Sequence, residues 1–84
     1  MSDLQAAFQQ AMADSKNLSD RPDNSTLLRL YALYKQGSTG DNGEAKPGFS
    51  DPVARAKWDA WNKIKGTSPD DAMQQYIDLI AELG

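Results

Sequence analysis

The spacing of apolar and aromatic residues between positions 27 and 36 is the feature that most constrains the fold of this chain. Leu27, Leu30, Tyr31 and Tyr34 recur three and four residues apart, which is the spacing of one face of an α-helix. Three further segments repeat this period, and no segment alternates apolar and polar residues as a half-buried strand does. We therefore expect an all-α fold of four helices.

Capping residues, prolines and glycines predict where these helices begin and end. Pro22 disfavours a helical residue before it, so we expect the first helix to end by residues 18–20. Gly66 is predicted to end the third helix, because glycine readily adopts the left-handed conformation. Residues 37–50 contain four glycines and are predicted to form a long loop between the second and third helices. The expected helix starts are Ser2 with Gln5 in a capping box, Asp23 or Ser25, Asp51 before Pro52, and Ser68 before Pro69.

The length and composition favour one small domain that folds without cross-links. At 84 residues the chain is near the lower end of what folds unaided, so we expect residues 1–84 to form a single domain. The absence of cysteine suits a reducing compartment. Met1-Ser2-Asp3 is acidic and no apolar core follows it, so we expect neither an export signal nor a membrane span. We expect a cytoplasmic protein and a monomer.

The charge and the missing residue types argue against several functions. A net charge of −3 disfavours a protein that binds nucleic acid by neutralising its phosphates. With no histidine or cysteine, the chain lacks the commonest general base, the commonest metal ligands and the best nucleophile. Asp70 and Asp71 lie at a predicted helix start, where capping explains them better than catalysis does. We predict a non-catalytic protein without a metal or cofactor.

Several residues leave two interpretations open when only their spacing is considered. Tyr31, Tyr34 and Lys35 lie on one side of the second helix, where two phenol rings and an ammonium can stack a base and hold an anion. Tyrosines at this spacing are, however, more often core residues. Lys57 interrupts an apolar stripe, either as a cation beside a pocket or as a lysine whose stem covers the core edge. Tyr76 lies on an aliphatic face, as a rim residue or as a buried one that needs a hydrogen-bond partner.

Several short sequence blocks extend from the second predicted helix to the fourth. They are Leu30-Tyr31-x-x-Tyr34-Lys35-Gln36, Thr39-Gly40-Asp41, Lys46-Pro47-Gly48, Lys57-Trp58-Asp59-Ala60-Trp61-Asn62, Lys65-Gly66-Thr67-Ser68, Ala72-Met73 and Tyr76-Ile77. In residue type and separation these blocks resemble the acyl-CoA-binding protein family. The resemblance runs from Phe8 to about Leu83, which is nearly the whole chain.

This resemblance implies a four-helix bundle, with a long loop between helices two and three, that binds long-chain acyl-CoA esters such as palmitoyl-CoA without chemistry. The implied site residues are Tyr31, Lys35, Lys57 and Lys16 for the CoA phosphate and head group, Tyr34 for adenine, and Met12, Leu27, Leu28 and Tyr76 for the acyl groove and its rim. These residue types suit the ligand, because phosphates need cations, a purine needs a ring, and an acyl tail needs an apolar trough.

Three positions depart from the common pattern of the family. Met12 stands where a small alanine is frequent, so the acyl groove is expected to be narrower or differently shaped. Gly37-Ser38 replaces the usual alanine-containing end of the second helix, so we expect that helix to fray earlier. Ser50-Asp51-Pro52 replaces a more apolar entry to the third helix. These departures bear on the preferred chain length rather than on the class of ligand.

Two other functions compete with acyl-CoA binding. One is a helical protein-interaction module that has lost the ligand. The other is a nucleic-acid binder that uses Trp58 with Lys57, which the acidic balance of the chain opposes.

Overall fold

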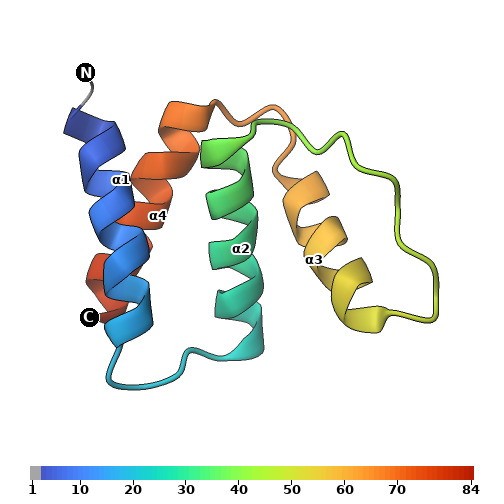
Figure 1. The fold of residues 1–84 in the computed structure, drawn as a ribbon, viewed down its shortest axis with the longest axis horizontal. Coiled ribbons are helices and arrows are strands. Elements are labelled where there is room, and N and C mark those ends of the chain that lie inside the picture. The colour runs from blue at the N-terminus through green and yellow to red at the C-terminus, as the bar shows by residue number, and fades with distance from the viewer. Residues whose placement is uncertain (1–2) are drawn as a thin grey trace.

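The computed structural model describes residues 3–84, and every regular element within that range is helical, as predicted. The capping box expected at Ser2 lies outside the described residues. The elements are α1 (Asp3–Asp14), a short 3₁₀ turn η1 (Ser15–Asn17), α2 (Asn24–Ser38), α3 (Pro52–Lys63) and α4 (Pro69–Leu83), shown in Figure 1. A long segment, residues 39–51, connects α2 to α3 as expected.

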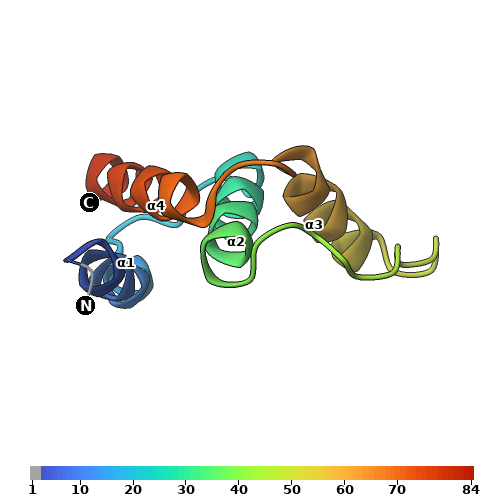
Figure 2. The same ribbon diagram turned by 90° about the horizontal axis from the view of Figure 1, so that it is seen from above.

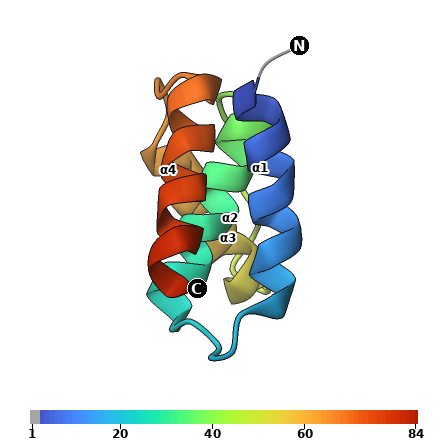
Figure 3. The same ribbon diagram turned by 90° about the vertical axis from the view of Figure 1, so that its left-hand side faces the viewer.

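The four helices form a flat assembly with α2 at its centre. α2 packs against α3 on one side and α4 on the other, while α1 packs mainly on α4 (Figure 2). Viewed from the side of α1 and α4, these two helices lie in front of α2 and α3 (Figure 3). The molecule measures 38 × 30 × 15 Å along its principal axes. None of the helices in residues 3–84 has the length and apolar character needed to cross a membrane.

The helix starts are capped as the sequence predicted. In each case a side-chain oxygen accepts the backbone N–H three residues further on, which satisfies one of the unpaired N–H groups of the first turn. The pairs are Asp23 with Thr26 at 2.8 Å, Asp51 with Ala54 at 3.0 Å, and Ser68 with Asp71 at 3.1 Å. α1 ends before residues 18–20, and Gly66 has a positive φ of 95° just after α3.

The prediction that the second helix ends early at Gly37 is wrong. α2 continues through Gly37 to Ser38, and Gly37 is buried. A Cβ at this position would lie 3.1 Å from both the Met73 Cγ and the Phe8 Cζ atoms. Because α1 and α4 approach α2 so closely here, the missing side chain is a packing requirement and not a helix stop.

The core lies between α1, α2 and α4. It consists of Phe8, Ala11, Leu30, Leu33, Ala72, Met73, Tyr76 and Ile80. Along α3 the apolar stripe that Lys57 interrupts is buried only toward its end, because Trp61 is 1% exposed while Val53 is 65% exposed. The first half of α3 diverges from α2 (Figure 1), and Val53 on it is accessible to solvent.

A buried glutamine attaches the long loop to α2 and α3. The Gln36 side chain is fully buried; its Nε2 donates to the Asp41 Oδ1 at 2.8 Å and to the Thr67 carbonyl at 2.7 Å. Its Oε1 accepts a hydrogen bond from the Trp61 Nε1 at 3.1 Å. The same indole N–H lies 2.9 Å from the Gly40 carbonyl. All polar atoms of the amide are thus used, which fixes α3 against the end of α2.

Candidate functional site

Two neighbouring pockets lie where α1 and η1 face α2 and α4. They have volumes of about 430 and 480 Å³ and share Ser15, Tyr34 and Tyr76 in their linings, so we call them the Tyr76 pockets. Leu27 and Tyr31 of α2 and Lys57 of α3 line the first. Met12 and Lys16 line the second.

A third pocket, of about 430 Å³, continues this surface between α2 and α3. It shares Leu27 and Lys57 with the first Tyr76 pocket and is also lined by Leu28, Val53 and Ala56. We call it the Val53 pocket. The two Tyr76 pockets and the Val53 pocket together form what we call the candidate groove.

The ring of Tyr76 packs in the core, and Tyr76 also lines both Tyr76 pockets. Tyr76 is 5% exposed, and its ring meets the Phe8 ring edge to face, with centroids 5.3 Å apart at 82°. Tyr76 is therefore buried rather than a rim residue, and it also borders the groove. No buried side-chain nitrogen or oxygen in residues 3–84 lacks a hydrogen-bond partner.

Lys57 places its ammonium at the edge of the groove. Its Nζ lies 5.3 Å from the centroid of the Tyr31 ring, and the residue is exposed. The ring face attracts the cation and so orients it without neutralising its charge. Both interpretations of Lys57 thus describe part of what is observed, because the charge reaches solvent and also borders a pocket.

Lys35 is placed differently from the other predicted cations. Its Nζ is 3.9 Å from a carboxylate oxygen of Glu44 and 4.9 Å from the centroid of the Trp61 ring. It lines neither the Tyr76 pockets nor the Val53 pocket. An anion in the groove would have to compete with Glu44 for this lysine.

Seven of the nine residues predicted from the sequence line the Tyr76 pockets: Met12, Lys16, Leu27, Tyr31, Tyr34, Lys57 and Tyr76. Leu28 instead lines the Val53 pocket and a further pocket on another side of α2, and Lys35 is held beside Glu44.

Ser15 belongs to the groove but was not among the predicted site residues. It lines both Tyr76 pockets, and its hydroxyl donates to the Met12 carbonyl at 2.7 Å. The only signal in the sequence is a serine on the otherwise apolar stripe of the first helix. Arg21 was also missed, and it lines the Val53 pocket from the turn before α2.

Asp41 joins the long loop to the junction between α3 and α4. Its Oδ1 accepts the backbone N–H of Gly66 at 2.9 Å as well as the amide of Gln36. These hydrogen bonds stabilise the carboxylate and lower the pKa of Asp41 from its usual value, with Gly66 contributing most and Gln36 next. The network positions α3 and therefore the end of the groove that Lys57 borders.

The groove combines features that suit binding of an amphiphilic ligand. Aromatic rings and apolar side chains line it, and ammonium groups stand at its edge. Among residues 3–84 there is no cluster of three or more His, Cys, Asp or Glu side chains that could hold a metal ion. The fold and the site define a small helical binding protein with a groove suited to an amphiphilic anion.

Comparisons with known proteins identify the family within this class. The family profile described as acyl CoA binding protein matches residues 5–80. The chain is 48% identical over 77 residues to acyl-CoA-binding protein homolog 1 of Caenorhabditis elegans, covering 92% of this chain and 90% of that protein. It is 49% identical over 76 residues to the acyl-CoA-binding protein homolog of Drosophila melanogaster, with coverage of 90% and 88%. The chain belongs to the acyl-CoA-binding protein family.

Solved structures of the family have the same fold. The crystal structure of Oryza sativa acyl-CoA-binding protein 2 matches with a TM-score of 0.91 at 38% identity, covering 95% of this chain and 89% of that one. The structure of the protein from Moniliophthora perniciosa matches with a TM-score of 0.88 at 34% identity, with coverage of 99% and 80%. The predicted four-helix bundle is thereby confirmed.

Proposed function

We propose that this protein binds medium- to long-chain fatty acyl-CoA esters, of the palmitoyl-CoA kind, and buffers and carries them without chemical change. Membership of the acyl-CoA-binding protein family supports this function. The observation that carries it in the structure is the continuity of the candidate groove, which joins a cationic, aromatic end to an apolar end through shared lining residues. We further propose that residues 1–84 act as one domain, as a cytoplasmic monomer.

The head group is proposed to bind at the aromatic and cationic side chains of α2 and α3. Lys57 and Tyr31, already in contact, would hold the 3′-phosphate, since an ammonium and a phenol hydroxyl both donate to phosphate oxygens. Lys35 would join them after leaving Glu44. Tyr34, 40% exposed, offers its ring to adenine. Lys16 would add positive charge near the head group.

The acyl tail is proposed to lie along the apolar lining of the groove. Leu27 borders both a Tyr76 pocket and the Val53 pocket, and Leu28 continues the apolar surface toward α3. Met12 lines the second Tyr76 pocket, where its length reduces the space available. Tyr76, which lines both Tyr76 pockets, would donate its hydroxyl hydrogen to a ligand oxygen.

Calorimetric titration with palmitoyl-CoA, CoA and palmitate tests this proposal. We expect one palmitoyl-CoA per chain, bound more tightly than either fragment, because only the ester occupies both ends of the groove. The function would be wrong if palmitoyl-CoA bound no better than CoA alone. Absence of binding by all three ligands would favour the alternative of a protein-interaction module.

A further inference from the structure

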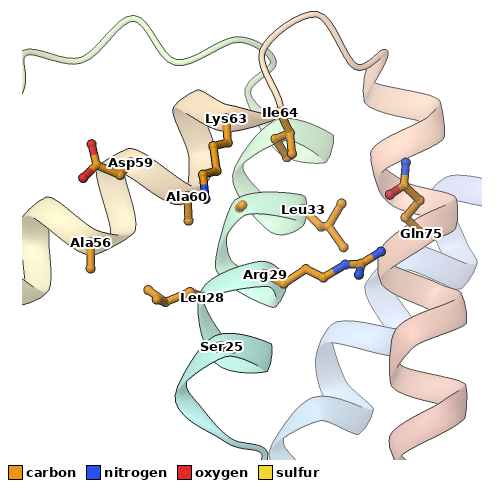
Figure 4. A pocket seen from close by; sticks show the side chains of 11 residues that line it. Ser25, Leu28, Arg29, Leu33, Ala56, Asp59, Ala60, Lys63, Ile64 and Gln75 are labelled. Carbon is orange, nitrogen blue, oxygen red and sulfur yellow. The ribbon is translucent and has the colours of Figure 1, made fainter.

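A separate pocket lies between α2, α3 and α4, on the side of α2 away from the Tyr76 pockets. Its volume is about 560 Å³, and Figure 4 shows the side chains around it. We call it the Ala60 pocket. Its apolar lining comes from Leu28, Ala32, Leu33, Ala56, Ala60 and Ile64.

The Ala60 pocket shares a wall with the candidate groove. Leu28 and Ala56 line the Ala60 pocket and also line the Val53 pocket. In Figure 4, Leu28 extends from α2 toward α3 at the level of Ala56. This is where α3 diverges from α2 (Figure 1), and Val53 there is 65% exposed. Two apolar side chains thus separate the end of the groove from a second apolar space.

Three charged residues, Arg29, Asp59 and Lys63, also line the Ala60 pocket. Arg29 extends toward Gln75 of α4, and Lys63 lies beside Ala60 (Figure 4). Neither cation forms an ion pair within residues 3–84, and both residues are exposed. Their aliphatic stems can border an apolar occupant while their charged ends stay in water.

We propose that the Ala60 pocket receives the terminal methylenes of very-long-chain acyl groups, which pass between Leu28 and Ala56 from the Val53 pocket. This inference rests on the proposed function and extends it to a class of ligand whose tail is too long for the groove. The occupant follows from continuity, because an apolar tail in the Val53 pocket would lie against Leu28 and Ala56, which line both pockets. Removal of further methylenes from water favours their entry into the next apolar space.

An alanine-to-leucine substitution at Ala60 tests the assignment. The added side chain fills the Ala60 pocket without lining the groove. The matched control is Ala7→Leu, since Ala7 is also a helical alanine but lines neither the Ala60 pocket nor the candidate groove. Calorimetry would compare dodecanoyl-CoA with tetracosanoyl-CoA on the wild type and both variants, with circular dichroism used to check that each variant is folded.

The expected result is a loss that depends on chain length. Each methylene denied burial lowers affinity by up to about fourfold, so Ala60→Leu should weaken tetracosanoyl-CoA by roughly tenfold and leave dodecanoyl-CoA nearly unchanged. Ala7→Leu should change neither. Equal effects of Ala60→Leu on both esters, or no effect on either, would overturn the assignment. Failure of the wild type to bind dodecanoyl-CoA would instead overturn the proposed function.

A second measurement on the unmodified chain does not depend on variants. In isotope-edited NMR, the terminal methyl of tetracosanoyl-CoA should show contacts with the methyl of Ala60 and the δ-methyl of Ile64. The terminal methyl of dodecanoyl-CoA should show none. Contacts of the long tail that stop at Val53 would overturn the proposal. Binding of palmitate at Ala60 while tetracosanoyl-CoA occupies the groove would also overturn the proposal. The Ala60 pocket would then be a site for a second amphiphile and not for the end of the same tail.

Discussion

At the scale of single residues, the ammonium of Lys57 lies beside an aromatic ring at the groove and not beside a carboxylate. Its Nζ lies 5.3 Å from the Tyr31 ring centroid, whereas the Lys35 Nζ lies 3.9 Å from a carboxylate oxygen of Glu44. Within residues 3–84 Lys57 forms no ion pair with a carboxylate, so its charge remains available to a phosphate. Lys57 is therefore the residue whose removal should affect the head group most directly.

We expect Lys57→Ala to weaken palmitoyl-CoA binding by about 1.5–3 kcal/mol, the usual range for a hydrogen bond to a charged group. Binding of the dephospho-CoA ester, which lacks the 3′-phosphate, should hardly change. Calorimetry with both esters measures the difference, and Lys65→Ala, which lies beyond α3, is the matched control. Equal losses for the two esters would assign Lys57 a structural role.

The carboxylate of Asp41 gives the loop a predictable dependence on pH. Its hydrogen bonds from Gly66 and Gln36 lower its pKa from 3.8. A lowered folded-state pKa means that the stabilisation is complete above the unfolded pKa and is lost as pH falls through the folded pKa. We expect Asp41→Asn to be less stable than the wild type at neutral pH. The difference in their free energies of unfolding should narrow below about pH 4. Urea unfolding followed by tryptophan fluorescence measures this gap.

The control for this experiment is Asp20→Asn, since Asp20 is exposed in the turn before α2. It should change the free energy of unfolding little at any pH. A gap for Asp41→Asn that stays constant from neutral to acid pH would contradict the assigned role of the carboxylate.

At the scale of helices, local chemistry predicted the starts well and one of the ends poorly. Asp23, Asp51 and Ser68 act within one turn of their own positions, so sequence alone located them. The sequence predicted a helix stop at Gly37 because the local residues do not show its packing. That packing involves Phe8, which is distant in the chain, and α4. The periodicity of α3 likewise indicated which side chains share a face. It did not show that only the end of that face meets α2.

The close approach at Gly37 leads to a stability prediction. Gly37→Val should lower the free energy of unfolding by about 1–3 kcal/mol, because the new side chain overpacks the contact among α1, α2 and α4. Urea denaturation measures the loss. Gly43→Val is the matched control, because a Cβ at Gly43 meets nothing within 4 Å and its φ is not positive. A loss as large at Gly43 would show that glycine flexibility, and not packing, is the cause.

At the scale of the whole molecule, the candidate groove is assembled from all parts of the chain. Lys16 comes from η1, Tyr31 and Tyr34 from α2, Lys57 from α3 and Tyr76 from α4. The family resemblance named these residues, but the spacing of Tyr31, Tyr34, Lys57 and Tyr76 alone left other interpretations open for each of these four. Only the packed structure shows that they border one groove, and that Ser15 joins them while Lys35 is held aside by Glu44.

The central claim is that one groove binds both ends of an acyl-CoA ester, and a chain-length series measures this most directly. Each buried methylene is worth up to about 0.8 kcal/mol, and ordering of the tail together with incomplete burial should reduce that by about half. From butyryl-CoA to dodecanoyl-CoA, eight added methylenes should therefore give about 3 kcal/mol, or more than a hundredfold in the dissociation constant. Calorimetry on the wild-type chain with esters of increasing length supplies these constants. A steady rise over this range is the predicted result, whereas constants that do not change with acyl length would mean that the tail stays in water and would contradict the carrier function.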